Sequence, residues 1–252
     1  MKHCVITGAA DGIGRALALR FGRAGYQITG IDRDPERSAA TTAQLETAGT
    51  LVTFLLANLG QPDDIIRVVT ELRAGPLIDV LIHNAGINSV SHFASSDLAQ
   101  QQAVLDVNLL APLLLMPALL RGQQLQTGGS VVFLSSLSHF VGYPGAPVYA
   151  ASKDGLAVYA RSLAVGRPDL HVLTVFPGPT RTAHARRYSP DNRRENRRMP
   201  PERLAEYIFQ AVQKRQRTLI PGLPNRFSAT MGRFFPGLAM WMMRKTILEK
   251  LP

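Results

Sequence analysis

Two side chains with acid–base chemistry stand four residues apart in the stretch Tyr149-Ala150-Ala151-Ser152-Lys153. In a helix this spacing places both on one face, about one turn apart. A lysine ammonium about 4 Å from a phenolate stabilises it by roughly 4 kcal/mol at an effective dielectric of about 20, or roughly 3 pK units. A phenol of pKa about 10 would then approach neutrality and act as a general acid or base. Helices contain this pattern by chance, so the surrounding elements must support it.

A glycine-rich turn follows the first apolar stretch of the chain. It joins an expected strand to an expected helix and consists of Thr7, Gly8, Ala9, Ala10, Asp11, Gly12, Ile13 and Gly14. The glycines permit a tight turn and close approach of a diphosphate, while the helix start offers free N–H groups and a positive dipole end. In this strand–turn–helix context the pattern favours a dinucleotide site over a plain connecting turn.

A carboxylate ends the second expected strand, 18 residues after the glycine turn. There Asp32 can accept hydrogen bonds from the adenosine ribose hydroxyls and would repel a 2′-phosphate. Asp11 adds negative charge in the same region, and both residues favour NAD over NADP. Arg33 favours NADP if it pairs with a phosphate, but it is equally suited to an exposed ion pair with Asp34 or Glu36.

Polar or small residues also follow the other expected strands, at the edge where parallel sheets bind ligands. Asn58, next to Leu59, can reach an adenine edge or cap the following helix. Asn108 is a polar residue in an apolar helix, where a buried amide needs partners or fills a kink. The remaining strand ends are Asn84-Ala85-Gly86, Ser135-Ser136 and Pro177-Gly178-Pro179-Thr180-Arg181-Thr182.

Short apolar runs alternate with longer helical patterns. The expected strands are His3–Thr7, Gln27–Ile31, Leu51–Ala57, Val80–His83, Ser130–Ser135, His171–Phe176 and Thr218–Ile220. The expected helices are Gly12–Ala24, Pro35–Ala48, Pro62–Ala74, Asp97–Arg121 with a bend or break at its two prolines, Val148–Val165 and Glu202–Lys214. Nearly continuous apolar strands separated by helices predict a parallel sheet covered on both faces. We therefore expect one doubly wound α/β domain over residues 1–252.

Cysteine and histidine usage narrows the chemistry. The single cysteine, Cys4, rules out an internal disulfide framework and favours a reducing, cytoplasmic setting. The histidines lack the spacing of metal ligands, so we expect no metal site. His92 and His139 are the histidines most suited to line a cleft, because each follows a strand-end motif.

The ordered set of motifs resembles the short-chain dehydrogenase/reductase family over residues 3 to about 182. The set comprises Thr-Gly-x-x-x-Gly-Ile-Gly, Asn-Ala-Gly, an Asn in the next helix, a Ser thirteen residues before Tyr-x-x-x-Lys, and Pro-Gly-x-x-x-Thr. Each motif is weakly specific, whereas their order and spacing are highly specific. The resemblance implies a Rossmann-type, seven-stranded sheet and a nicotinamide cofactor.

The resemblance also implies a role for each matching residue. Tyr149 would be the catalytic acid/base, Lys153 would lower its pKa and bind the nicotinamide ribose, and Ser136 would hydrogen-bond the reacting oxygen. Asn108 would hold a water that relays protons. The cofactor would contact the turn from Gly8 to Gly14, Asp32, Asn84 to Gly86, and Thr180 with Thr182. Asn58 departs from the family's usual Asp facing the adenine, which would alter binding slightly.

Excess positive charge is confined to the C-terminal quarter. Residues 1–180 hold 12 Lys and Arg against 13 Asp and Glu, while residues 181–252 hold 16 against 5. The expected substrate lid, residues 183–200, contains six arginines, which indicates an anionic substrate or carrier or else a solvated loop. Nucleic acid is disfavoured because aromatic residues that stack bases are nearly absent there.

The C-terminal extension, residues 226–252, mixes apolar and basic residues. From Phe227 to Leu251 it holds Phe, Trp, Met, Leu and Ile side chains among four Lys and Arg. Three interpretations remain open: a wall of an apolar pocket, a subunit interface, or an amphipathic anchor on an anionic membrane. We rank pocket or interface before membrane.

We therefore expect an NAD-dependent oxidoreductase that interconverts a bulky, largely apolar secondary alcohol and its ketone. An NADPH-dependent reductase of 3-oxoacyl-type thioesters and a non-catalytic NAD-binding scaffold are the alternatives. The helices Asp97–Arg121 and Val148–Val165 are plausible contact surfaces of a homodimer or homotetramer, as in relatives.

Overall fold

The computed structural model describes residues 1–189 and 191–250. Within them, parallel strands form one seven-stranded sheet in the order β3-β2-β1-β4-β5-β6-β7. The strands are β1 (His3–Thr7), β2 (Gln27–Asp32), β3 (Val52–Leu56), β4 (Ile78–His83), β5 (Leu125–Leu134), β6 (His171–Val175) and β7 (Thr218–Leu219). The predicted parallel, doubly wound α/β fold is confirmed. β5 begins five residues before the expected Ser130, because Leu125 pairs with Ile78 ahead of a register shift.

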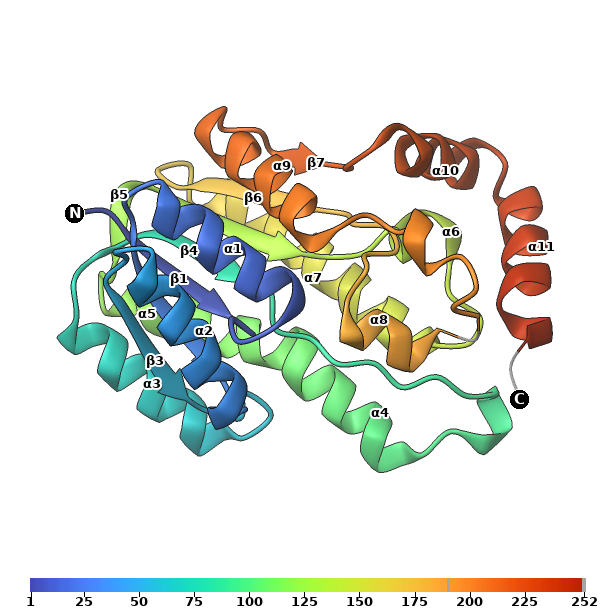
Figure 1. Ribbon diagram of the computed structural model, residues 1–252. Coiled ribbons are helices and arrows are strands. Elements are labelled where there is room, and N and C mark those ends of the chain that lie inside the picture. The colour runs from blue at the N-terminus through green and yellow to red at the C-terminus, as the bar shows by residue number, and fades with distance from the viewer. Residues whose placement is uncertain (190, 251–252) are drawn as a thin grey trace.

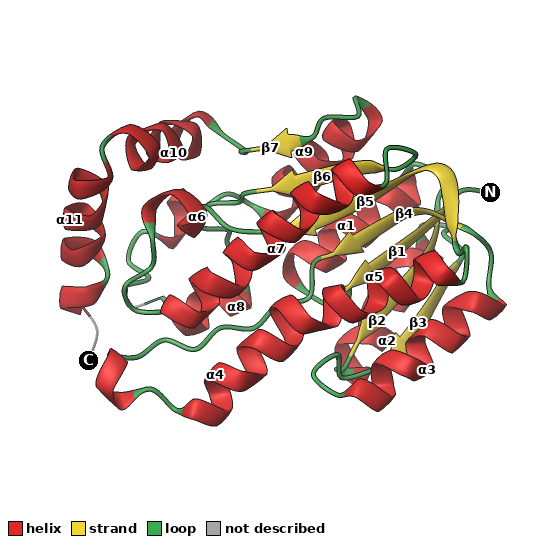
Figure 2. Cartoon of the chain, turned by 180° about the vertical axis from the view of Figure 1, so that it is seen from behind, coloured by secondary structure: helices red, strands yellow, loops and turns green. Residues whose placement is uncertain are grey.

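Helices cover both faces of the sheet (Figures 1 and 2). One face packs against α1 (Gly12–Arg23), α2 (Pro35–Thr47) and α9 (Pro201–Gln213). The other packs against α3 (Pro62–Ala74), α5 (Ala111–Arg121) and α7 (Pro147–Gly166). Strand residues such as Val5 and Ile6 are fully buried on alternate faces, which is why the strands carry nearly continuous apolar sequence.

The long helix expected over Asp97–Arg121 is divided into three parts. α4 (Leu98–Leu105) passes into a π-helical turn, η2 (Asp106–Leu110), before α5. Pro112 explains the wide turn, because proline lacks an N–H and its ring clashes with the carbonyl four residues earlier, that of Asn108. The helix is not interrupted at Pro117, since α5 continues through it, and a bend there stays a prediction.

The same segment, Leu98–Arg121, is long and apolar enough to cross a bilayer, with a mean hydropathy of 2.0. Core helices of soluble proteins meet the same criterion. Here Leu115, Met116 and Leu119 are fully buried against the sheet and its neighbouring helices.

The C-terminal quarter adds helices that the sequence patterns did not delimit. They are α8 (Ala183–Tyr188), α10 (Leu223–Phe234) and α11 (Pro236–Thr246), with the short α6 (Ser138–Val141) earlier in the chain and 3-10 turns η1 (Phe93–Ser95), η3 (Glu195–Arg197) and η4 (Leu248–Lys250). α10 and α11 lie beyond α6 at one end of the molecule (Figure 1). Pro190 of the predicted lid and Leu251 of the extension lie outside the described residues.

Candidate active site

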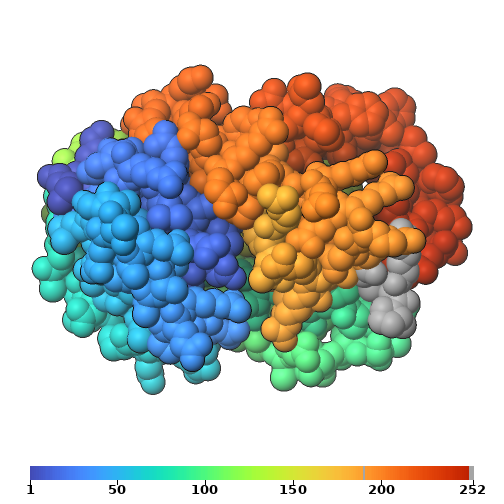
Figure 3. Space-filling model, in the orientation of Figure 1, coloured from blue at the N-terminus to red at the C-terminus, as the bar shows by residue number. Residues whose placement is uncertain are grey.

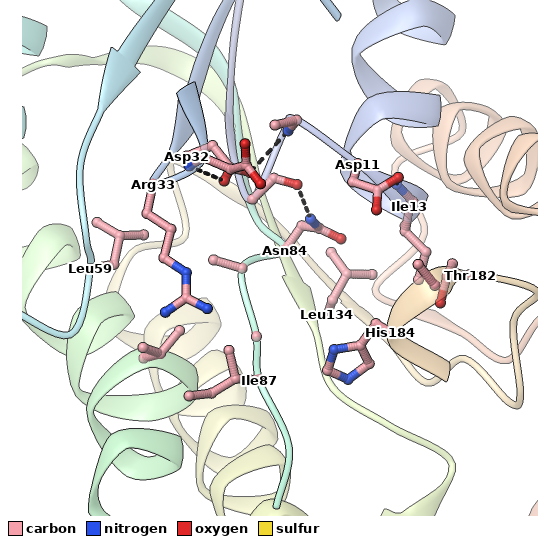
Figure 4. A pocket seen from close by; sticks show the side chains of 18 of the residues that line it. Asp11, Ile13, Asp32, Arg33, Leu59, Asn84, Ile87, Leu134, Thr182 and His184 are labelled. Carbon is pink, nitrogen blue, oxygen red and sulfur yellow. Dashed lines mark hydrogen bonds between the residues drawn. The ribbon is translucent and has the colours of Figure 1, made fainter. Parts of the chain in front are cut away.

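A cleft of roughly 400 Å³ opens at the carboxyl ends of the neighbouring strands β1 and β4, where the strand order of the sheet reverses. Its walls come from the ends of the first five strands and from the lid helix α8 (Figures 3 and 4). The predicted site residues that line it are Gly8, Asp11, Gly12, Ile13, Asp32, Arg33, Asn58, Leu59, Asn84, Ala85, Gly86, Tyr149, Lys153, Pro177 and Thr182. Gly14, Asn108, Ser136, Gly178 and Thr180 are not among its lining residues.

The glycine turn has the geometry that a diphosphate needs. Gly8 and Gly12 adopt φ of +67° and +54°, where residues with a side chain are strained. A Cβ on Gly14 would lie only 1.8 Å from the carbonyl oxygen of Gly8. Asp11 caps α1 by accepting a 2.7 Å hydrogen bond from the N–H of Gly12. The first N–H groups of α1 lack intrahelical partners and can bind an anion, so these residues fit a dinucleotide.

Asp32 and Arg33 lie at the adenosine end of the cleft (Figure 4). The Asp32 carboxylate accepts hydrogen bonds from the N–H groups of Ala10 (3.0 Å) and Asp34 (3.1 Å), which fix it while leaving lone pairs for ribose hydroxyls. In the described part of the chain Arg33 forms no ion pair with Asp34 or Glu36, and Figure 4 shows its guanidinium extending into the cleft.

Arg37 adds positive charge beside two carboxylates at this end of the cleft. It pairs with Asp34 at 3.4 Å and with Asp11 at 3.3 Å. The negative charge of Asp11, which we expected to disfavour a 2′-phosphate, is therefore partly neutralised. The expected preference for NAD over NADP therefore rests on Asp32, which stays a prediction.

Asn58 does not cap α3, because the N-cap residue of that helix is Gln61 and no side chain caps it. Its Oδ1 accepts a hydrogen bond from the N–H of Gly60, and its own N–H donates to Asp64. The residue still lines the cleft together with Leu59, so a contact with the adenine remains a prediction.

The segment after β4 is tied to the end of β1. Asn84 donates through Nδ2 to the carbonyls of Thr7 and Gly8, and the Thr7 hydroxyl accepts from the N–H groups of Asn84 and Ala85. A Cβ on Gly86 would lie 3.2 Å from Nζ of Lys153. The hydrogen bonds hold the two strand ends together. The lack of a side chain at Gly86 lets its backbone pass close to Lys153.

Asn108 lies in the π turn and is fully buried. Its Oδ1 accepts from the N–H of Ile87 at 2.8 Å, and its Nδ2 donates to Ile87 O and to Oγ of Ser152. Ser152 in turn donates to the carbonyl of Tyr149. The side chain therefore links η2, the segment after β4 and α7, and its expected role in holding a water stays a prediction.

Tyr149 and Lys153 meet in the cleft as their spacing predicts, on one face of α7. The buried Lys153 donates from Nζ to the carbonyl of Leu134 at 2.9 Å, and Nζ lies 5.9 Å from the Tyr149 ring centroid. Ser135 anchors the same helix by donating to Lys153 O. Ser136 lies close enough to Tyr149 for a side-chain hydrogen bond that lowers the pKa of the phenol, while its expected contact with the reacting oxygen stays a prediction.

The expected depression of the Tyr149 pKa by Lys153 alone is wrong. Burial raises the pKa of Tyr149 to about 12, although the hydrogen bond with Ser136 opposes the shift. Burial also lowers the pKa of Lys153 to about 8. Desolvation disfavours the charged forms of both groups, and it is the largest cause of both pKa shifts.

The turn after β6 divides its residues between two tasks. Thr182 lines the cleft, caps α8 by accepting from the N–H of Ala185, and would contact a Cβ on Gly12 at 3.2 Å. Thr180 is buried, and its hydroxyl donates to the carbonyl of Gly178. The predicted contact of Thr180 with a nicotinamide amide therefore has no support from its side chain, whereas that of Thr182 does.

Four residues of α8 line the cleft but were not predicted individually as site residues: Ala183, His184, Arg187 and Tyr188. Desolvation, then the charges of Lys153 and Arg187, lower the pKa of His184. The effect of Lys153 shows that the His184 imidazole lies near it. The position of these α8 residues directly after the Thr182 cap was the available signal. His92 and His139 do not line this cleft; Nδ1 of His139 lies 2.7 Å from Oδ1 of Asp154. Among residues 1–189 and 191–250, no group of three or more His, Cys, Asp or Glu is arranged to hold a metal ion.

Comparisons with known proteins identify the family. A family model described as short chain dehydrogenase matches residues 2–193. Dehydrogenase/reductase SDR family member 4 of Homo sapiens is 30% identical over 200 residues, which cover 77% of this chain and 71% of that protein. The 3-oxoacyl-[acyl-carrier-protein] reductase of Rattus norvegicus is 32% identical over 181 residues, covering 70% and 75%.

A solved structure agrees with the sequence relatives. The short-chain dehydrogenase from Sphingobium yanoikuyae in complex with NADPH has a TM-score of 0.79 and 26% identity, covering 96% of this chain and 95% of its own. The chain belongs to the short-chain dehydrogenase/reductase family. It is an NAD(P)-dependent oxidoreductase.

Proposed function

We propose that this enzyme interconverts a bulky secondary alcohol and its ketone, with Tyr149 as the general acid/base. The observation that supports this most strongly is the convergence of Tyr149, Lys153 and the glycine turn on one cleft. A nicotinamide cofactor, when bound, accepts or supplies the hydride. In oxidation the Tyr149 phenolate takes the hydroxyl proton, and Ser136 donates a hydrogen bond to the substrate oxygen.

Lys153 keeps a positive charge close to the site where the phenolate forms. Its Nζ is fixed by the carbonyl of Leu134, so no side-chain entropy is lost when the charge is needed. We propose that it also binds the nicotinamide ribose, with Gly86 leaving the space for that contact. Asn108 acts as a positioning residue, because it holds Ile87 and the start of α7 in register.

We propose NAD as the preferred cofactor. Asp32 supports this preference, since its anchored carboxylate faces the place where a 2′-phosphate would lie. The neutralised Asp11 and the free guanidinium of Arg33 favour NADP instead, and so keep open a second candidate, an NADPH-dependent reductase of 3-oxoacyl-type thioesters. The relation to the rat acyl-carrier-protein reductase agrees with that candidate.

The substrate side of the cleft is aromatic with one basic residue. Tyr143 packs edge-on against Tyr149 with ring centroids 6.1 Å apart, and Tyr188 and Arg187 line the cleft from α8. Three of the other five lid arginines have partners within the lid: Arg186 pairs with Glu195, Arg193 pairs with Asp191, and Arg198 donates to Ser189. We propose an apolar, ring-bearing or branched substrate whose anionic group, where present, is bound by Arg187.

The experiment is a screen of secondary alcohols, graded by chain length and with or without a carboxylate, using NAD and NADP separately. We expect the highest kcat/KM with NAD and a bulky apolar alcohol. Arg187→Ala should raise KM about tenfold for the carboxylate members and leave kcat and the uncharged members unchanged, since a charged hydrogen bond is worth about 1.5–3 kcal/mol. The exposed Arg186→Ala is the control. Activity confined to NADPH and acyl thioesters would favour the second candidate.

We propose a homodimer or homotetramer formed through the α4–α5 and α7 segments. Leu110, Leu114 and Val158 leave between 40% and 51% of their surface exposed there, and such apolar residues mark contact faces. A cytoplasmic setting, inferred from the single buried Cys4, remains part of the proposal.

A further inference from the structure

Helix α10 turns its large apolar side chains away from the protein. Leu223, Phe227 and Phe234 are 79%, 69% and 68% exposed, and at 100° per residue these positions share one face. The opposite face carries Ala229 and Gly232, which are buried. A surface helix in water normally has the reverse arrangement.

Helix α11 repeats the pattern. Leu238, Trp241 and Met242 are exposed, whereas the small Ala239 is buried. The orientation of both helices is fixed by close packing on α6 and the loop after it. A Cβ on Gly232 would lie 2.1 Å from the carbonyl oxygen of Phe140, and one on Gly142 would lie 3.1 Å from Sδ of Met240.

Basic residues accompany this face. Residues 223–250 hold five Lys and Arg and one acidic residue, Glu249. Arg233 is exposed and has no ion-pair partner in the described part of the chain. Arg226 bonds only the carbonyl of Ile220, while Arg244 and Lys245 share Glu249. We call the exposed residues Leu223, Arg226, Phe227, Arg233, Phe234, Phe235, Leu238, Trp241, Met242, Arg244 and Lys245 the α10–α11 face.

Two of the three interpretations of this segment lose support. The α10–α11 face does not wall the cleft, because none of its residues is among the cleft's lining residues. A two-fold subunit contact would place this face against its own copy, and the unpaired arginines would then face like charges. An anionic lipid surface complements both features, since apolar side chains enter the boundary of the acyl chains and Lys and Arg meet the headgroups.

We propose that the α10–α11 face docks on the surface of an anionic lipid bilayer. The protein would lie on the membrane rather than span it through these helices, which have 12 and 11 residues, well short of the roughly 20 that a spanning helix needs. The bilayer would not cover the opening of the cleft but would lie near it, and an amphiphilic alcohol or ketone is available there.

The chain supplies its own reporter for the test. Trp241 is the only tryptophan and lies on the proposed face, so its fluorescence reports docking directly. We expect a blue shift of its emission with vesicles of phosphatidylcholine and 30% phosphatidylglycerol, with at least tenfold weaker partitioning to phosphatidylcholine alone. Raising the salt to 0.5 M should weaken binding, because it screens the charges.

Variants distinguish docking through the α10–α11 face from nonspecific adsorption of the protein to vesicles. Arg233→Gln with Lys245→Gln should reduce partitioning roughly 25-fold, at roughly fivefold for each basic residue removed. Phe227→Ser with Phe234→Ser should reduce it at least as much, while Ile66→Ser, which removes an apolar side chain of similar exposure from α3, should not. Equal binding to both vesicle types, or a blue shift that depends on protein concentration without lipid, would overturn the proposal; the second result would indicate a subunit interface.

Discussion

Residues 1–182 and residues 183–250 place polar and apolar groups in opposite ways. In the first region buried polar side chains such as Asn108, Ser135 and Ser152 each have protein partners, and the charge is nearly balanced. In the second, large apolar side chains such as Trp241 face outward beside unpaired basic ones. The difference indicates that the first region defines the chemistry, while the second determines what reaches the site and where the protein resides.

The largest expected effect lies in the first region. Tyr149→Phe should lower kcat about 10³-fold, since a general acid or base contributes about 10²–10⁴, and should leave cofactor affinity within about threefold. The matched control is Tyr143→Phe, which removes the neighbouring phenol and should cost less than about tenfold. Substantial turnover by Tyr149→Phe would show that the two regions do not divide chemistry and access as described.

Gly14→Ala tests the glycine turn. The new Cβ would overlap the carbonyl oxygen of Gly8, so the turn must shift away from the place of the diphosphate. We expect NAD affinity to fall at least about 100-fold, roughly 3 kcal/mol, as measured by calorimetry. Gly25→Ala is a control at a glycine with open space around its Cα, and its effect should be confined to stability. Unchanged NAD binding by Gly14→Ala would place the dinucleotide elsewhere.

Among the described residues of the first region, Ser38, Gln101 and Ser138 each leave one buried polar atom without a hydrogen-bond partner, and His83 leaves both ring nitrogens without one. Its ring stacks on Phe133, 4.9 Å between centroids, and neither nitrogen has a protein partner within the described residues. Burial lowers the pKa of His83 to about 3. The unfolded chain, with a histidine pKa of about 6.5, binds the proton more readily below that pH, so stability is complete above pH 6.5 and is lost as pH falls towards 3.

The free energy of unfolding should therefore fall by about 2 kcal/mol from pH 7 to pH 5 because of His83. His83→Phe should remove this part of the dependence of the unfolding free energy on pH, as measured by urea denaturation at each pH. The exposed His92→Gln should not. An identical slope in wild type and His83→Phe would contradict the assignment.

Asp32 and Arg33 give the smallest effect, a change in the ratio of two affinities. Asp32→Ala should weaken NAD about tenfold relative to NADP, because charged hydrogen bonds to the ribose are lost. Arg33→Ala should weaken NADP relative to NAD. The ratio is the quantity to measure, since Asp32 also holds the N–H groups of Ala10 and Asp34 and its loss weakens both cofactors. A ratio that does not respond to either change would remove these residues from cofactor selection.

The sequence predicted the parts of the fold that repeat simple patterns. Apolar runs and glycine or proline boundaries located every strand and six long helical segments, with β1 and α3 correct to the residue, but not α10 and α11. The π turn at Asp106–Leu110 was not predicted, because it results from the competition between Pro112 and the buried hydrogen bonds of Asn108. Short helices such as α6 and α8 lack a full period of apolar residues and gave no signal.

The site was predictable where motif spacing dictates it and not where packing does. Tyr149, Lys153 and the glycine turn meet as expected. The direction of the Tyr149 pKa shift could not be predicted, because it depends on desolvation and on a side-chain separation that spacing alone does not determine. The outward orientation of Phe234 and Trp241 likewise depends on glycine contacts between distant segments.

We propose that Tyr149 becomes the base once the oxidised cofactor adds its positive charge to that of Lys153. This proposal can be tested without a known substrate by ultraviolet difference spectra of wild type and Tyr149→Phe near 295 nm, titrated with and without NAD. We predict that NAD makes one tyrosinate appear below pH 10 in wild type only, from a pKa of about 12 without cofactor. No tyrosinate below pH 10 with NAD bound, or the same signal in Tyr149→Phe, would contradict the account.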